Sequence, residues 1–145
     1  MLTQDAIARL KDQVPDLAGR IEGAADLAVV LRKGGIPQVT PAAHVLASGL
    51  TGGKAETILG AFAQVVGRLV SVVLYFRSRD KTSRRGLDGV EEIIEAAVTA
   101  LIGWTPDPAT LGVFSLRGGR LVSVDADALV YQYDFVLSDE MRITS

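Results

Sequence analysis

His44 is the side chain best suited to acid–base chemistry, because it is the single histidine in a chain of 145 residues. An imidazole titrates near neutral pH and can act as a general base. A lone histidine cannot form a multi-histidine metal site, and no serine nucleophile motif lies nearby. Ala43 and Val45 flank it in a run that is typical of a strand. We therefore predict a partly buried histidine within a sheet.

The segment Gly49–Ala55 superficially resembles a phosphate-binding loop. Its first glycine is one residue too close to Gly53 and Lys54 for that motif, and Ala55 replaces the Ser or Thr that would bind Mg²⁺. Without that hydroxyl group the metal site fails. We therefore interpret Thr51–Gly53 as a mobile hairpin tip and expect no nucleotide or other cofactor.

Asp125 and Asp127 could bind a hard cation through their carboxylates. They lie between two predicted strands, where Asp is favoured because it bonds to the local backbone, so a solvated turn is the preferred interpretation. The chain has no cysteine, which excludes disulfides, thiolate metal sites and cysteine nucleophiles. We predict neither a catalytic site nor a metal site, and therefore a protein that is not an enzyme.

The segment from residue 77 to residue 85, RSRDKTSRR, breaks all periodicity and is strongly basic, which predicts an exposed loop. Its cationic residues are Arg77, Arg79, Lys81, Arg84 and Arg85. They are candidates for contact with DNA phosphates or with an acidic surface of a partner protein. A solvated loop is the alternative. No aromatic residue interleaves with the charges, so stacking on bases is not expected.

Composition limits the class of protein. The 15 basic and 17 acidic residues give a net charge of -2, so no whole-molecule field attracts nucleic acid. The length and the 48% hydrophobic content suit one domain over residues 1–145. The charged N-terminus lacks the apolar region of a signal peptide. Ile58–Phe76 is long enough to span a bilayer, but it contains Gln64 and Arg68 and is rich in Val, so we predict a buried strand and no membrane association.

Periodicity predicts the elements that position these residues. Apolar residues at helical spacing predict helices over residues 3–14, 24–32 and 87–101. Runs of branched and aromatic residues predict strands, at residues 20–23, 42–49, 61–77, 113–117, 120–124 and 128–137. Gly118 and Gly119 are the expected two-residue turn of a hairpin. Trp104 is expected to pack the end of the last helix against the sheet.

The order of these elements indicates the α+β class. We predict a single domain in which helices pack on one face of a mainly antiparallel sheet. The segment 61–77 is apolar on both faces, so it is expected to be a central strand.

Several segments together resemble the tail terminator, or tail completion, proteins of long-tailed bacteriophages. The residues that carry the resemblance are IARLK at 7–11 with QVP at 13–15, IEGAADL at 21–27, PQVTPAA at 37–43 with the strand that follows, the Val-rich strand ending at Arg77, and LIGWTPD at 101–107. They extend over most of the chain, and their order and spacing carry the resemblance. None of them is a catalytic motif.

The resemblance implies a homo-oligomer, usually a hexameric ring, that caps the tail tube and ends its polymerisation. Such a protein is made in the host cytoplasm and is located in the virion, in the tail at the neck. Its partners would be the tail tube protein and a head-completion or neck protein, for which the ring presents a docking surface. The basic loop would then be a candidate for non-specific contact with DNA passing through the lumen.

Two other functions remain open from the sequence. The chain could be another neck protein or minor tail protein of a phage, which would differ in its position in the particle. The more remote alternative is a small cytoplasmic enzyme or ligand-binding domain that uses His44 with a carboxylate.

Overall fold

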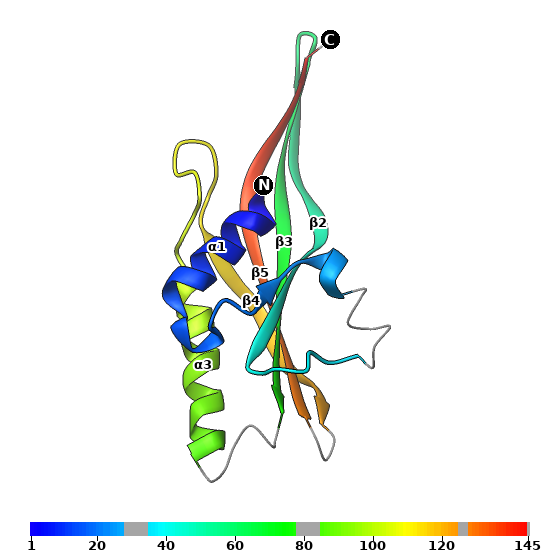
Figure 1. Cartoon of the computed structure of the whole chain (residues 1–145). Helices are drawn as coiled ribbons and strands as arrows, with labels where there is room; N and C mark the ends of the chain where they lie inside the picture. The colour runs from blue at the N-terminus through cyan, green and yellow to red at the C-terminus, as the bar shows by residue number, and fades with distance from the viewer. Residues whose placement is uncertain (28–34, 78–84, 125–127, 145) are drawn as a thin grey trace.

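One five-stranded sheet runs the length of the molecule, as Figure 1 shows. The computed structural model describes residues 1–27, 35–77, 85–124 and 128–144. In chain order the elements are α1 (Leu2–Gln13), the 3-10 helix η1 (Pro15–Leu17), β1 (Ile21–Glu22), β2 (Ala42–Ile58), β3 (Ala61–Arg77), α3 (Arg85–Leu101), β4 (Phe114–Val124) and β5 (Ala128–Thr144). In the part of the chain that the structure describes, no helix is both long and apolar enough to cross a bilayer.

The sheet is mixed but mainly antiparallel, as predicted, with one parallel pair that the sequence did not indicate. Its strand order is β1-β2-β3-β5-β4. Three pairings are antiparallel, but β1 pairs with β2 in parallel, with Ile21 opposite Ala43. The long connection over residues 23–41 permits this pairing, because parallel neighbours need a crossover of a dozen or more residues.

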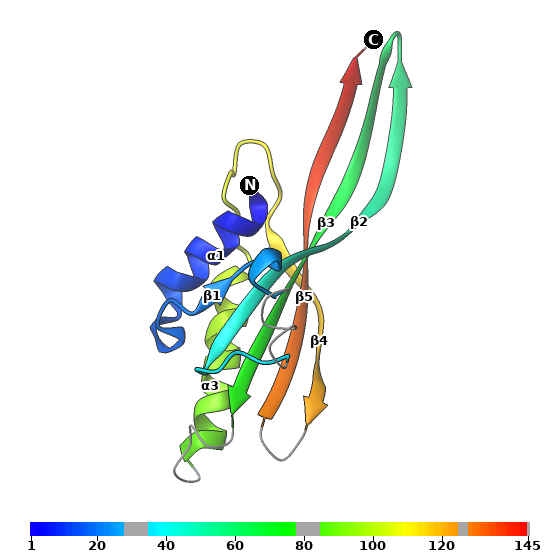
Figure 2. The ribbon, with the colours of Figure 1, turned by 45° about the vertical axis from the view of Figure 1, so that its right-hand side comes forward.

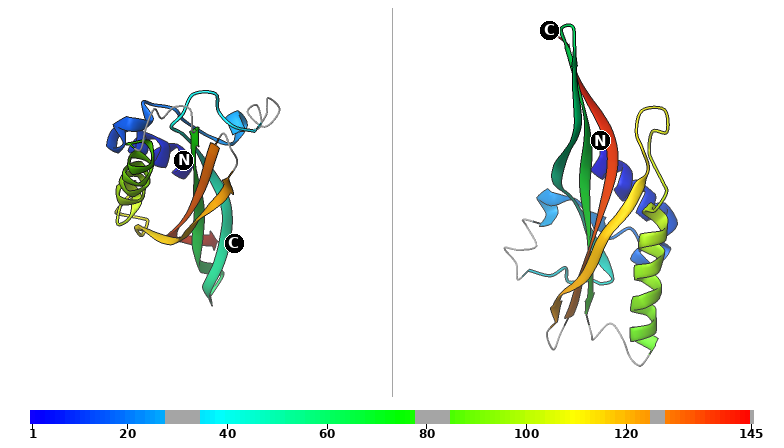
Figure 3. Two further views of the ribbon diagram at one scale, coloured as in Figure 1. Left: turned by 90° about the horizontal axis from the view of Figure 1, so that it is seen from below. Right: turned by 180° about the vertical axis from the view of Figure 1, so that it is seen from behind.

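The helices α1 and α3 pack on the same face of the sheet, as predicted (Figure 3, left). The guanidinium group of Arg9 in α1 donates a hydrogen bond of 2.9 Å to the carbonyl oxygen of Ala100 in α3, which ties the two helices together. Every second residue of β3 from Val70 to Phe76 points into the core that they cover. The most buried large side chains of this core are Leu10, Leu17, Leu74, Phe76, Leu101, Phe114, Phe135 and Leu137.

The opposite face of the sheet carries a second, smaller cluster. Val73 and Tyr75 of β3 and Val130 of β5 are buried there, with Ile36 and Leu46 packed against them. The strand β3 is therefore covered on both faces in its second half, which confirms the predicted central strand with its bounds at Ala61 and Arg77.

The strand β2 continues well beyond Gly49, so the predicted hairpin tip at Thr51–Gly53 is wrong. Thr51 and Gly52 lie opposite Gly67 and Val66, and the chain reverses only at Leu59 and Gly60. Two shifts of register, one between Ala47 and Gly49 and one between Gly52 and Ala55, absorb the extra residues. The glycines mark bulges in a long strand, since a bulge leaves residues unpaired without ending the pairing.

The expected hairpin at Gly118 and Gly119 is also wrong, because both residues lie inside the continuous strand β4. Gly118 pairs with Asp134 and Gly119 with Tyr133 of β5. The ring of Tyr133 lies so close to Gly119 that a side chain there would overlap it. An aromatic ring that covers a strand glycine explains the pair without a turn.

Three strands extend past the helices as a projection that we call the arm (Figures 1 and 2). The arm comprises residues 50–68, from β2 through the turn into β3, and residues 137–144 of β5. Leu50, Arg68 and Leu137 lie side by side at its root, and Leu59 lies at its tip. The predicted strands at 42–49 and 128–137 stopped at this root and missed the arm.

Candidate functional site

His44 is held inside the sheet and is 2% exposed. Its Nδ1 atom lies 3.1 Å from the hydroxyl oxygen of Tyr75, and the two rings meet edge to face. Burial lowers the pKa of His44, although the carboxylates of Glu22 and Asp26 partly oppose this effect, and burial raises the pKa of Tyr75 to about 12. A substrate cannot reach this pair, so His44 is a packing residue and more deeply buried than predicted.

The remaining motifs do not form a chemical site in the structure. The phosphate-loop resemblance at Gly49–Ala55 lies in an extended strand, where no loop surrounds an anion, and Lys54 pairs with Glu56 at 3.5 Å. Asp125 and Asp127 lie outside the described residues. Within the described ranges, no three His, Cys, Asp or Glu side chains come together as metal ligands would.

A row of polar side chains crosses the second face of the sheet. The Ser71 hydroxyl lies 2.5 Å from a carboxylate oxygen of Asp134 and 2.7 Å from the Ser48 hydroxyl, and the Gln132 amide donates to Asp134 at 2.9 Å. Partial burial tends to raise the pKa of Asp134, but these hydrogen bonds, with Arg120 and Arg117 nearby, lower it overall. The carboxylate is thus stably ionised and anchors the row, with no imidazole beside the serine to activate it.

The structure describes only part of the basic loop. The Arg77 guanidinium donates to the carbonyl oxygens of Pro37 at 2.9 Å and Ile36 at 3.3 Å, so Arg77 fastens a neighbouring segment to the sheet. Arg85 is the first residue of α3. Arg79, Lys81 and Arg84 lie outside the described residues.

Trp104 packs as expected where α3 meets the sheet. Its ring stacks on Phe114 with the centroids 6.0 Å apart, and the Arg9 guanidinium lies 5.4 Å from the indole centroid. The indole therefore joins α1, the end of α3 and β4 in one contact.

The arm is the largest feature that the helices leave uncovered. Its exposed apolar residues are Leu50, Ile58, Leu59, Val65, Met141 and Ile143. Among the described pairings, no strand joins its two outer edges, which are β2 beyond residue 50 and β5 beyond residue 137. Uncovered apolar surface of this extent is typical of a protein-binding surface.

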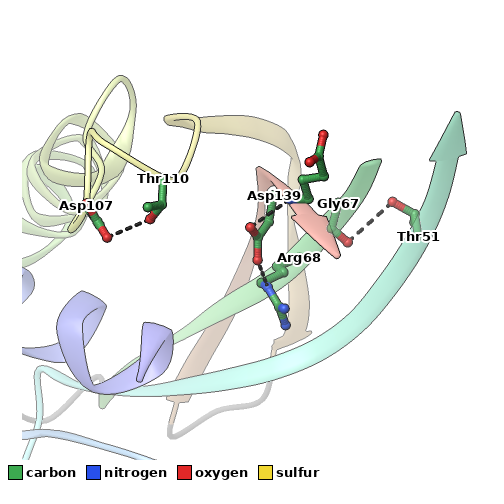
Figure 4. Close-up of polar contacts among 7 residues, drawn as sticks. Thr51, Gly67, Arg68, Asp107, Thr110 and Asp139 are labelled. Carbon is green, nitrogen blue, oxygen red and sulfur yellow. Dashed lines mark hydrogen bonds and ion pairs between the residues drawn. The ribbon is translucent and has the colours of Figure 1, made fainter. Parts of the chain in front are cut away.

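A groove of about 590 Å³ lies at the root of the arm. Its walls come from the start of α1, from β2 and β3, and from the connection between α3 and β4, including Leu2, Leu50, Leu69 and Leu111. Arg68 and Asp139 form an ion pair of 2.7 Å in it, and Thr110 donates to Asp107 on the other side (Figure 4). The backbone N–H of Gly112 donates to Ser138, which fixes this connection to the arm.

Sequence reasoning missed both the arm and the groove. The signal for the arm was present in Leu137, Met141 and Ile143, which lie on the face of Phe135 in β5. Interspersed charges concealed it, because exposed strands carry polar residues between apolar ones. The groove had no local signal, since its walls come from segments far apart in the sequence.

The chain resembles known proteins both in its fold and in its sequence family. In a solved structure described as the virion of a native gene transfer agent particle, one chain has a similar fold, with a TM-score of 0.55 at 14% sequence identity. The similarity covers 97% of this chain and 95% of that chain. No curated protein matches the sequence. The phage tail terminator protein family matches residues 1–145. The chain therefore belongs to the phage tail terminator protein family and is a structural component of a phage tail.

Proposed function

We propose that this protein forms a ring, a hexamer by resemblance to its family, that caps the tail tube and ends its polymerisation. The observation that carries the proposal is the family match over residues 1–145 in a chain whose arm leaves apolar faces and two strand edges uncovered. Closed rings are built from contacts between two different surfaces of each subunit. The proposed role is non-enzymatic, and the burial of the one imidazole in packing is compatible with it.

The proposed partners are the last ring of the tail tube on one side and a head-completion or neck protein on the other. The basic loop is the proposed contact with a partner or with DNA in the lumen, through Arg79, Lys81, Arg84 and Arg85. Arg77 is set apart from this role, because its guanidinium already binds carbonyl oxygens of its own chain. Phosphate contacts of this kind would be independent of sequence and sensitive to salt.

Electron microscopy of tail tubes assembled with and without the purified protein tests the capping role. We expect tubes that grow without limit in its absence and stop, with a ring at one end, in its presence. Tubes of unlimited length with no bound ring would overturn the proposal. A ring found elsewhere in the particle would indicate another neck or minor tail protein.

The basic loop is tested by replacing Arg79, Arg84 and Arg85 together with Ser. Because these changes spare Arg77, we expect an unchanged fold and intact capping, but a loss of joined heads and tails. The control is Arg117→Ser with Arg120→Ser, which removes two positive charges from β4. Normal phage yield from the triple variant would remove the proposed role of the loop.

A further inference from the structure

We propose that the arm is the contact between neighbouring subunits, and that its tip occupies the groove at the root of the next subunit's arm. This inference rests on the proposed ring and names the surfaces that would close it. The partner is a second copy of this chain. The argument depends on the charge, the size and the position of the arm and the groove.

The charges of the arm exclude an ionic partner. The arm contains three cationic and three anionic residues: Lys54, Arg68 and Arg142, and Glu56, Asp139 and Glu140. All six are paired with one another, in the ion pairs Lys54–Glu56, Arg68–Asp139 and Arg142–Glu140. A surface of zero net charge with its ions already paired does not attract DNA or an acidic protein. Its binding energy would therefore come from its apolar residues and from the unpaired backbone groups of its strand edges.

The groove is also internally satisfied. Asp139 is paired with Arg68, Asp5 lies 3.8 Å from the terminal amino group of Met1, and Asp107 accepts hydrogen bonds from Thr110 and from the backbone of Ala109. An anion or cation would have to displace these contacts. Apolar side chains would not, and Leu2, Leu50, Leu69 and Leu111 present apolar surface in the groove. The groove therefore suits an apolar occupant.

The size of the arm matches what a subunit contact requires. Residues 61–68 of β3 span about 26 Å, and three strands are about 14 Å wide, so the two faces together offer about 700 Å². A stable interface buries about 800 Å² on each partner. One arm is therefore close to a full interface.

The position of the tip excludes a contact with the groove of its own chain. Leu59 is 101% exposed, and Ile58 and Ile143 beside it are more than half exposed. They lie at the end of the arm remote from the groove, about 26 Å away, so the tip cannot fill its own groove. A tip in the neighbour's groove joins two different surfaces, which is the geometry that closes a ring.

Disulfide cross-linking of the full chain tests this contact, with no background from native cysteine. We expect Leu59→Cys and Leu111→Cys, combined in one chain, to give a ladder of covalent oligomers on oxidation, since a disulfide needs Cα atoms within about 7 Å. The control pair is Val124→Cys with Leu111→Cys, which should remain monomeric under denaturing conditions. Oligomers of native size that never cross-link through Leu59 and Leu111, or that cross-link equally through Val124, would overturn the inference.

A charge substitution provides a second measurement. Ile143 in the arm and Val124 in β4 are both 61% exposed, so Ile143→Asp and Val124→Asp are matched. We expect Ile143→Asp to weaken self-association by about tenfold or more in sedimentation velocity, with unchanged circular dichroism, and Val124→Asp to leave it unchanged. The reverse result would assign the contact to β4.

The two proposals can fail separately. If Ile143→Asp leaves the ring intact but abolishes binding to tail tubes, the arm binds the tube, and the subunit contact is overturned while capping stands. If rings form through the arm but never bind tubes, the capping role is overturned and this inference stands.

Discussion

At the scale of single residues, the imidazole of His44 makes the folding stability of the protein depend on pH. Burial lowers its pKa below the ordinary value of 6.5, so the folded protein binds a proton less readily than the unfolded chain. The contribution of the neutral imidazole to folding stability is therefore fully present above pH 6.5. It falls as the pH drops below that value, until His44 of the folded protein is also protonated. The chain has no other histidine, so few other groups titrate in this range.

We predict that His44→Gln removes most of this pH dependence. The variant should be less stable than the natural protein at pH 8, because Gln packs poorly against Tyr75, but its stability should change less between pH 8 and pH 5. Urea unfolding at several pH values measures both quantities. If the unfolding free energies of the two proteins change equally with pH, His44 does not cause the pH dependence.

At the scale of elements, the contrast between Gly118 and Gly119 determines how β4 tolerates change. A methyl group at Gly119 would overlap the Tyr133 ring, whereas one at Gly118 would meet no atom within 4 Å. We predict that Gly119→Ala costs about 1–3 kcal/mol of unfolding free energy, because overpacking forces side chains from their rotamers. Gly118→Ala should stay within about 0.5 kcal/mol or stabilise the protein slightly. Similar losses in chemical denaturation would contradict the proposed role of the ring.

The elements also show which parts of the structure local patterns predict. Strand β3 and helix α3 were predicted closely, since each has an uninterrupted pattern of its own. The glycine pairs were misinterpreted as turns, because their roles depend on Tyr133 and on the bulges opposite β3, which lie elsewhere in the sequence. Parallel pairing of β1 had no signal in a strand of two residues. The groove could not be predicted, because it exists only after α1 and the arm root meet.

At the scale of the whole molecule, the arm should differ in local stability from the rest of the described chain, which we call the body. Residues 70–76 of β3 have packed side chains on both faces, whereas in residues 61–68, which belong to the arm, Val66 alone is buried. Both halves are paired with β2 and β5, so the same strand provides its own control.

We predict that amide hydrogens of residues 61–68 exchange about 100-fold faster than those of residues 70–76 in the monomer, since local opening there exposes little buried surface. Assembly should slow the exchange in the arm and leave the body unchanged. Hydrogen exchange followed by mass spectrometry at low and high protein concentration measures both. Equal protection from exchange in residues 61–68 and 70–76 at low concentration would contradict the expected difference between the arm and the body.

The position of β3 between β2 and β5 affects how the nascent chain folds during translation. Its ladder with β5 joins Arg77 to Ala128 and Ala61 to Thr144, so all of α3 and β4 must leave the ribosome before this pairing can begin. Until then the β2–β3 hairpin presents a valine-rich edge without its second partner, and such an edge pairs readily with other chains. Translation speed and chaperone supply should therefore govern how much usable protein a host cell yields.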